Sequence, residues 1–175
     1  MARPARRCRE DRRPLVTTTP QIRYSARALL LDEDDRLLLF SSVDDANGET
    51  FWYPVGGGIK EGESPEDALR REVEEETGRT EFEIGPQIWY REAVASWGGN
   101  TYDCRERFYL CRVSHFSVDT SGFSQGEIDT VSGHRWWTLD ELDAATDRLV
   151  PADLAPRLRA VLTDGAPAEP DVVGS

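Results

Sequence analysis

The segment Gly57–Arg79, GGIKEGESPEDALRREVEEETGR, decides the fold because it carries the start and stop signals of one helix. Ser64 is a favourable N-cap, and Pro65 suits the first helical position, where no intrahelical N–H is needed. Gly78 is a natural end because glycine adopts the left-handed conformation at little cost. The segment therefore predicts a helix over residues 65–77.

Four glutamates crowd the last turns of this helix. On a helical wheel of about 100° per residue, three of these glutamates lie in or beside the apolar arc, namely Glu72, Glu75 and Glu76. Glu74 points to solvent. Two such carboxylates repel by about 3 kcal/mol at a separation of about 6 Å and an effective dielectric of about 20. A hard divalent cation with oxygen ligands would resolve this conflict. The alternative is a charged helix end that is tolerated at some cost.

Charge and composition exclude several classes of protein. The net charge is −12 although residues 1–13 are rich in arginine, so the body of the chain is too acidic for a general nucleic-acid binder. The three cysteines predict neither a disulfide framework nor a zinc site. The sequence has no apolar run long enough to span a membrane and no signal peptide. We therefore expect a cytoplasmic protein with no nucleic-acid or membrane partner.

The wider sequence predicts one α+β domain over residues 21–162. Strand-like segments precede and follow the central helix, and a polar loop is expected over 114–134. Residues 1–20 are expected to be a disordered arginine-rich leader. Residues 163–175 are expected to be a flexible tail.

The segment also resembles the Nudix box in every chemically important position: Gly57, five residues, Glu63, seven residues, Arg71-Glu72, the apolar Val73, one residue, Glu75-Glu76, one residue and Gly78. The closing position is usually apolar but is Arg79 here, so Phe82 is expected to take over its packing role. Val55 stands where the family often has proline. The resemblance implies an α/β/α sandwich with a mixed β-sheet and a catalytic loop–helix motif.

The resemblance further implies a pyrophosphohydrolase that uses Mg²⁺ or Mn²⁺ to cleave a nucleoside diphosphate linked to another moiety. ADP-sugars and nucleoside triphosphates are the leading substrate classes. The implied metal ligands are three glutamates and one backbone carbonyl: Glu72, Glu75, Glu76 and the carbonyl of Gly56 or Gly57. The resemblance also implies that Glu63 and Arg71 pair and so hold the loop against the helix. The glycines Gly56–Gly58 would let the backbone approach the phosphates.

The general base and the substrate contacts remain open at this level. The base is Glu75 or Glu76 within the box or Glu127 in the later loop, with Glu106 a weaker candidate. Trp52 could stack on a nucleobase, and Arg105 and Arg107 could contact phosphate. Core packing for the tryptophan and solvation for the arginines are the plain alternatives. A homodimer is possible.

Three other functions are alternatives to metal-dependent cleavage of a diphosphate. The stretch GFSQG, residues 122–126, matches a serine-hydrolase nucleophile elbow, but that motif needs a strand before it and a helix after it, and both flanks read as polar loop. A non-catalytic nucleotide sensor would not require the complete glutamate set. A diphosphate isomerase of the same fold would need a suitably placed cysteine, and neither Cys104 nor Cys111 follows such a pattern.

Overall fold

A computed structural model describes residues 20–44, 47–97 and 100–174, with the side chain of Trp97 outside the description. The expected leader lies almost entirely outside the described residues. The elements, in chain order, are β1 (Gln21–Leu31), β2 (Leu37–Val43), β3 (Thr50–Gly58), α1 (Pro65–Thr77), β4 (Glu83–Trp97), β5 (Asn100–Arg112), α2 (Gln125–Thr130), β6 (Val131–Trp137), α3 (Leu139–Asp143), β7 (Arg148–Leu149), α4 (Leu154–Asp164) and β8 (Asp171–Val172).

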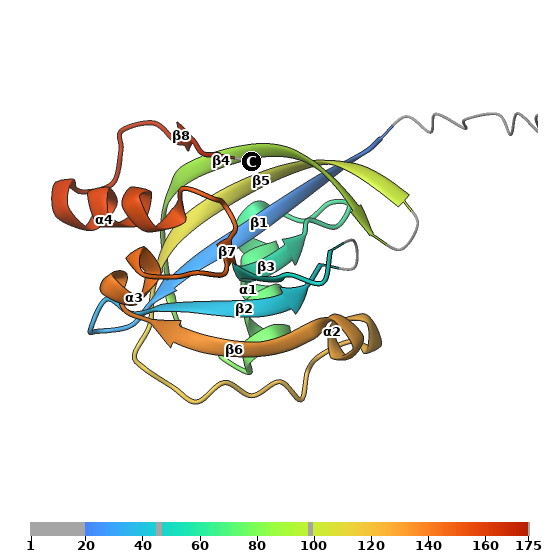
Figure 1. Ribbon diagram of the computed structural model, residues 1–175, viewed down its shortest axis with the longest axis horizontal. Helices are drawn as coiled ribbons and strands as arrows, with labels where there is room; N and C mark the ends of the chain where they lie inside the picture. Colours follow the sequence, from blue (N-terminus) through green and yellow to red (C-terminus); the bar gives the residue numbers. More distant parts are fainter. Residues whose placement is uncertain (1–19, 45–46, 98–99, 175) are drawn as a thin grey trace, which may run out of the picture.

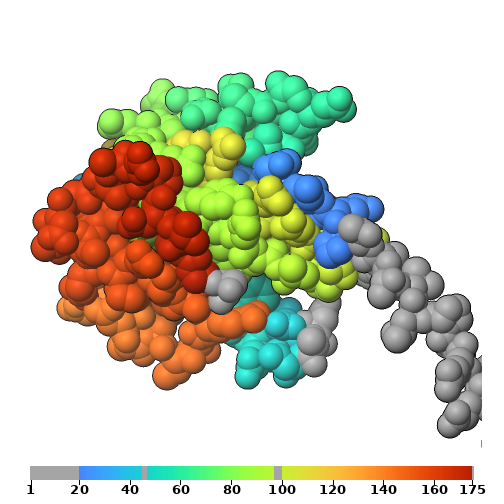
Figure 2. Space-filling model, turned by 90° about the horizontal axis from the view of Figure 1, so that it is seen from above, coloured from blue at the N-terminus to red at the C-terminus, as the bar shows by residue number. Residues whose placement is uncertain are grey.

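The strands form one mixed sheet in the order β6-β2-β3-β1-β5-β4-β8, and β7 pairs with β3. β1 runs parallel to β5 and antiparallel to β3, while β4 and β5 form a long hairpin. Helix α1 lies on one face of the sheet and α3 and α4 lie on the other (Figure 1). Figure 2 shows the same layers from above, with α4 and the α1 region on opposite sides of the β4–β5 hairpin. The predicted α+β class and mixed sheet are confirmed.

Each face of the sheet has its own apolar core. Neighbouring residues of a strand point to opposite faces, so Leu29 packs in the core under α3 and α4, whereas Leu30 packs in the core under α1. The uninterrupted apolar run of β1 is therefore the sequence signature of a strand buried on both sides. Each fully buried leucine contributes about 1.5–3 kcal/mol relative to an exposed one.

Helix α1 has the predicted bounds and caps. The Ser64 hydroxyl accepts the Asp67 backbone N–H at 3.1 Å, and Gly78 ends the helix with a φ of 71°. Phe82 packs against the α1-side core, as expected. Arg79 places its guanidinium over the ring of Phe116, so its aliphatic stem still covers apolar surface.

The segment after β5 docks on the C-terminal end of α1. The Asp119 N–H donates to the Thr77 carbonyl at 3.0 Å, which satisfies one of the unpaired carbonyls of the last turn. A Cβ at Gly122 would lie 2.4 Å from the Glu75 carbonyl. Only glycine allows so close an approach, and this contact fixes where the chain enters α2.

Two expectations about the chain after β5 are wrong. Residues 125–134 are not a polar loop, because they form α2 and the first part of β6. The end of the chain is not wholly a flexible tail: β8 pairs with β4, and Val173 is buried in the core next to α4. A strand of two residues is too short to show a periodic pattern. The outer limits of the domain stay a prediction.

None of the helices in the described residues is long and apolar enough to cross a membrane.

Candidate active site

Three carboxylates from two helices converge at one end of α1. Glu72, Glu76 and Glu127 each offer an oxygen, and these atoms lie within 4.8 Å of one another. Glu72 and Glu76 are one turn apart on α1 and are only 8% and 9% exposed. Glu127 belongs to α2. The structure thus brings together two predicted metal ligands and the predicted late acid.

Glu75 lies outside this cluster. Its carboxylate pairs with Arg71 Nη1 at 3.1 Å and its side chain is 45% exposed. Glu74 is exposed, as the helical wheel predicts. Because the salt bridge holds Glu75 at the edge of the helix face, the structure does not favour it over Glu76 or Glu127 as metal ligand or base. Its role stays a prediction.

Arg71 joins the loop before α1 to the helix. Its Nε and Nη2 donate to the two carboxylate oxygens of Glu63 at 2.8 and 2.9 Å, and Nη2 also donates to the Gly58 carbonyl at 2.9 Å. Nη1 donates to Glu72 at 2.6 Å. Hydrogen bonds from Arg71 and from the Lys60 backbone lower the pKa of Glu63 to about 2. The expected brace between Glu63 and Arg71 is present, and it also orients Glu72.

The glycines of β3 press against the two buried carboxylates. The Gly56 N–H donates to Glu76 Oε2 at 2.8 Å. Gly56 has a φ of 125°, and a Cβ there would lie 2.2 Å from the Ala26 carbonyl. A Cβ at Gly57 would lie 2.7 Å from the Glu72 carboxylate. Both positions therefore require glycine. The Gly56 carbonyl, an expected metal ligand, accepts a hydrogen bond from the guanidinium of Arg27.

The electrostatics of the cluster suit a divalent cation. Burial raises the pKa of Glu76 to about 8; the Gly56 N–H and Arg27 oppose this shift, and Glu72 and Glu127 add to it. The charged form of Glu76 is therefore disfavoured in the protein alone, and a cation beside it would offset this effect. Three carboxylate oxygens are the donor set that Mg²⁺ and Mn²⁺ prefer, so these residues fit such an ion.

Glu127 is held by the cap of its own helix. The Ser124 N–H donates to Glu127 Oε2 at 2.6 Å, and the Ser124 hydroxyl accepts the Glu127 N–H at 3.4 Å. Ser124 is the serine of GFSQG. Residues 113–124, all within the described part of the chain, contain no strand, so the serine caps a helix and does not form a nucleophile elbow.

The expected substrate contacts other than the glycines, which are Trp52, Arg105 and Arg107, do not gather at the carboxylates. Trp52 packs on the α3–α4 side of the sheet, with its ring centroid 5.0 Å from that of Trp137 and its Nε1 3.0 Å from Asp147. The core-packing alternative describes it better. Arg105 is 3.3 Å from Asp103. Arg105 and Arg107 alternate along β5 and share the α1 side of the sheet with Tyr109. Arg105 pairs across the strands with Tyr24, which lines the nearest depression, but neither arginine is among the lining residues.

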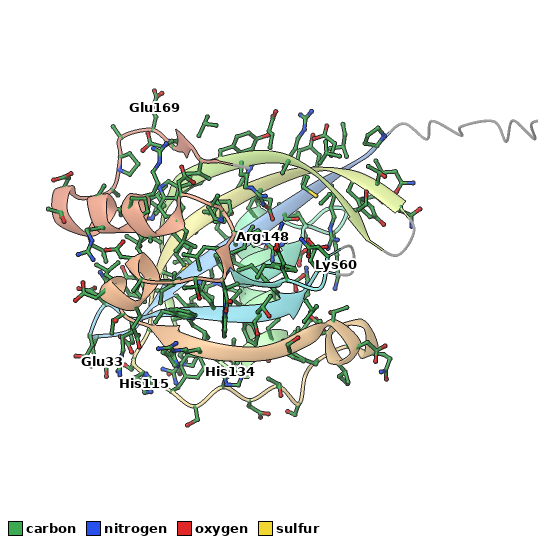
Figure 3. The ribbon with its side chains drawn as sticks, in the orientation of Figure 1. Glu33, Lys60, His115, His134, Arg148 and Glu169 are labelled. Carbon is green, nitrogen blue, oxygen red and sulfur yellow. The ribbon has the colours of Figure 1, made fainter. Side chains whose placement is uncertain are left out.

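That depression borders the carboxylates. Its volume is about 410 Å³, and its lining residues are Ile22, Arg23, Tyr24, Gly58, Ile59, Lys60 and Glu72. Of these residues, Gly58 and Glu72 were expected at the site from the sequence. Tyr24 lies at this depression because β1 pairs with β3. The register of that pairing could not be predicted from the sequence. Figure 3 places Lys60 at the end of β3, away from His115 and His134, and His115 binds the buried Asp32 at 3.0 Å.

Comparison with known proteins assigns the family. Residues 21–159 match the model of the NUDIX domain. The chain belongs to the Nudix family. As a Nudix hydrolase it acts on phosphoanhydride bonds.

The Nudix hydrolase has both sequence relatives and structural neighbours. It is 30% identical over 123 residues to an RNA pyrophosphohydrolase of Rickettsia prowazekii, with 65% of this chain and 73% of the relative covered. It is 32% identical over 122 residues to that of Saccharophagus degradans, with 62% and 69% covered. The MutT protein of Methanosarcina mazei superposes with a TM-score of 0.58 at 18% identity, covering 85% of this chain and 98% of that one. The Ap4A hydrolase of C. elegans gives a TM-score of 0.59 at 17% identity, covering 81% and 98%. The structural matches show the shared fold.

Proposed function

We propose that this Nudix hydrolase cleaves a diphosphate linking a nucleoside to another moiety, by attack of water on phosphorus, with Mg²⁺ or Mn²⁺ held by the glutamate cluster. ADP-sugars and nucleoside triphosphates are the proposed substrates. The observation that carries the proposal is the convergence of Glu72, Glu76 and Glu127 within 4.8 Å, from two separate helices, beside the glycines of β3.

Each residue has a distinct task in this proposal. Glu72 and Glu76 bind the ion, because they are the buried pair on one face of α1. When bound, the ion neutralises phosphate charge and lowers the pKa of a water molecule. Glu127 accepts the proton of the attacking water, since it completes the cluster from the more exposed side. Gly57 and Gly58 bring the backbone close to the phosphates: the missing side chain of Gly57 makes room for the Glu72 carboxylate, and Gly58 lines the depression.

The depression beside Glu72 supports a substrate that extends beyond its diphosphate. Tyr24 is 48% exposed there, which is unusual for a large ring inside a sheet, and it offers a face for a nucleobase. Lys60, the only lysine of the chain, lies on the rim beside Arg23. Two cations at the mouth of an acidic site would draw in an anionic substrate.

A substrate panel tests the proposal. ADP-ribose, the common nucleoside triphosphates, a dinucleoside polyphosphate and a 5′-triphosphorylated RNA are incubated with the full chain and Mg²⁺ or Mn²⁺, and phosphate is measured directly and after phosphatase treatment. We expect turnover of a small nucleotide substrate that EDTA abolishes. Turnover that survives chelation and is stopped by a fluorophosphonate would refute the proposal. Turnover of the RNA alone would keep the chemistry but overturn the substrate class.

A further inference from the structure

A buried ion cluster lies next to the glycines of β3. Glu106 of β5 is 5% exposed and receives two guanidinium groups: Arg27 Nε at 3.0 Å and Arg91 Nη1 at 2.6 Å. Burial raises the pKa of Glu106, but the two arginines outweigh this effect and hold it below its ordinary value. Glu106 is therefore an ionised anchor between β1 and the β4–β5 hairpin, and no step of the proposed reaction uses it.

Arg27 has a second contact that Arg91 lacks. While its Nε binds Glu106, its Nη1 donates to the carbonyl of Gly56. The N–H of the same Gly56 donates to the carboxylate of Glu76. A continuous chain of contacts thus runs from Glu106 through Arg27 and Gly56 to Glu76. For Arg91, the hydrogen bond and the salt bridge found both end on Glu106.

From this chain of contacts we propose that Arg27 is a positioning residue, which fixes the Gly56 carbonyl and thereby the presentation of Glu76 to the metal. Glu106 anchors the guanidinium, and Arg91 only completes the charge balance of Glu106. The inference rests on the metal-binding role proposed for Glu76.

The local chemistry explains why such support is needed. Gly56 has no side chain and adopts a φ of 125°, a region in which L residues are strained. Its peptide groups are therefore oriented by the pairing of β3 with β1 and by the hydrogen bonds to their N–H and C=O, with no help from a side chain. A guanidinium can bind a carboxylate and a carbonyl at once because its donors form a rigid fork. A lysine at the same place keeps the charge but cannot reproduce that fork.

Charge-conserving substitutions separate positioning from charge. Arg27→Lys and Arg91→Lys make the same chemical change on the two partners of Glu106, and only the first touches Gly56. Mn²⁺ affinity of the full chain is measured by electron paramagnetic resonance, and melting temperatures are recorded without metal. We expect Arg27→Lys to bind Mn²⁺ about tenfold more weakly, the scale for groups that orient metal ligands. Arg91→Lys should stay within about twofold of the parent, although both variants lose stability.

Amide hydrogen exchange at Gly56 gives a second measurement that needs no metal. We expect the Gly56 N–H to exchange faster in Arg27→Lys than in Arg91→Lys or the parent, because its peptide has lost an anchor. Unchanged Mn²⁺ affinity in Arg27→Lys, or an equal loss in Arg91→Lys, overturns the inference. If Arg27→Lys does not fold, Glu106→Gln replaces it in the test. A Mn²⁺ affinity of Glu106→Gln equal to that of the parent would again overturn the inference.

The two proposals fail differently. If the parent protein binds no Mn²⁺, the proposed metal site is wrong. Gly56 exchange then still decides whether Arg27 orients the glycine loop: exchange that is equal in the two lysine variants overturns the inference.

Discussion

The carboxylate of Glu76 accepts the backbone N–H of Gly56 at 2.8 Å, inside the protein. This single hydrogen bond joins the helix that carries the acids to the strand that carries the glycines. It leaves one oxygen of Glu76 for another partner, and it makes the position of that oxygen depend on the conformation of β3.

The first prediction separates the faces of α1. We expect Glu76→Gln to lower kcat at least about a hundredfold, the loss typical of a group at the reaction centre. Glu74→Gln should stay within about threefold, because this residue is solvated. Steady-state kinetics on the two purified variants measure both values of kcat. An equal loss of kcat in both would refute the assignment of Glu76 to the site and Glu74 to the solvent side of α1.

The second prediction concerns removal of the metal. EDTA should abolish activity, and excess Mg²⁺ or Mn²⁺ should restore it. Saturation at a hundred times Kd adds about 2.7 kcal/mol of stability, which corresponds to a rise of about 5–10 °C in melting temperature for a chain of this size. Scanning fluorimetry measures the shift. Glu72→Gln should reduce it strongly, whereas a full shift in that variant would argue against the site.

The third prediction concerns Glu127. We expect Glu127→Gln to lower kcat by about two to four orders of magnitude, since the proton acceptor is gone. Asp129→Asn is the matched control, because Asp129 lies on the same short helix, is exposed, and accepts a hydrogen bond from Gln125. A kcat in Glu127→Gln close to that of the parent would transfer the role of base to a glutamate of α1.

The fourth prediction tests the close approach of backbone to carboxylate. A Cβ at Gly57 would lie 2.7 Å from the Glu72 carboxylate, whereas a Cβ at Gly133 would make an ordinary contact of 3.5 Å with the Ser41 hydroxyl. Gly57→Ala should displace Glu72 and weaken Mn²⁺ binding at least about tenfold. Gly133→Ala should leave it unchanged. Titration calorimetry on both variants makes the comparison, and tight binding by Gly57→Ala would contradict it.

The fifth prediction is a pH dependence of stability. Burial raises the pKa of Asp32, but hydrogen bonds from the Arg36 backbone, His115, the Asp34 backbone and the Arg36 side chain outweigh it, so the folded pKa lies below 3.8. A carboxyl whose pKa is lower in the folded state stabilises the fold at pH values above its pKa in the unfolded state. This contribution disappears as the pH falls through its pKa in the folded state.

Asp32→Asn should therefore cost about 2 kcal/mol at pH 7, and the difference should shrink below a pH of about 4. Urea denaturation at pH 7 and pH 3 measures both values. Asp34→Asn is the control, since the Asp34 side chain is 69% exposed. A difference that stays constant with pH would contradict the account.

The helix and its acids were predictable because their signals are local. Ser64, Pro65 and Gly78 mark the ends of α1, and the 3.6-residue period separates Glu74 from Glu72 and Glu76. The bracing pair of Glu63 and Arg71 followed from the resemblance, and the structure confirms the contact. These features depend on residues close together in the chain.

Features that depend on strand pairing were not predictable. Arg27 meets Glu106 across 79 residues, and Tyr24 reaches the depression because β1 pairs with β3 and β5. The sequence left open whether Trp52 stacks on a nucleobase or packs in the core, because it does not say to which face of the sheet a residue turns. In the structure Trp52 packs against the core on the α3–α4 side. The α2 helix was missed because its six residues, with Ile128 as their one large apolar side chain, carry no periodic signal. Ser124 and Glu127 form a capping box that could have revealed it.

The contact of Gly122 with the Glu75 carbonyl has a consequence for protein engineering. This contact places the segment that leads into α2 against α1, so the position of Glu127 relative to the acids of α1 depends on it. Residues 57–79 alone therefore do not contain the whole site. A graft of residues 57–79 into another scaffold would carry two of the three carboxylates and leave behind the segment that positions the third.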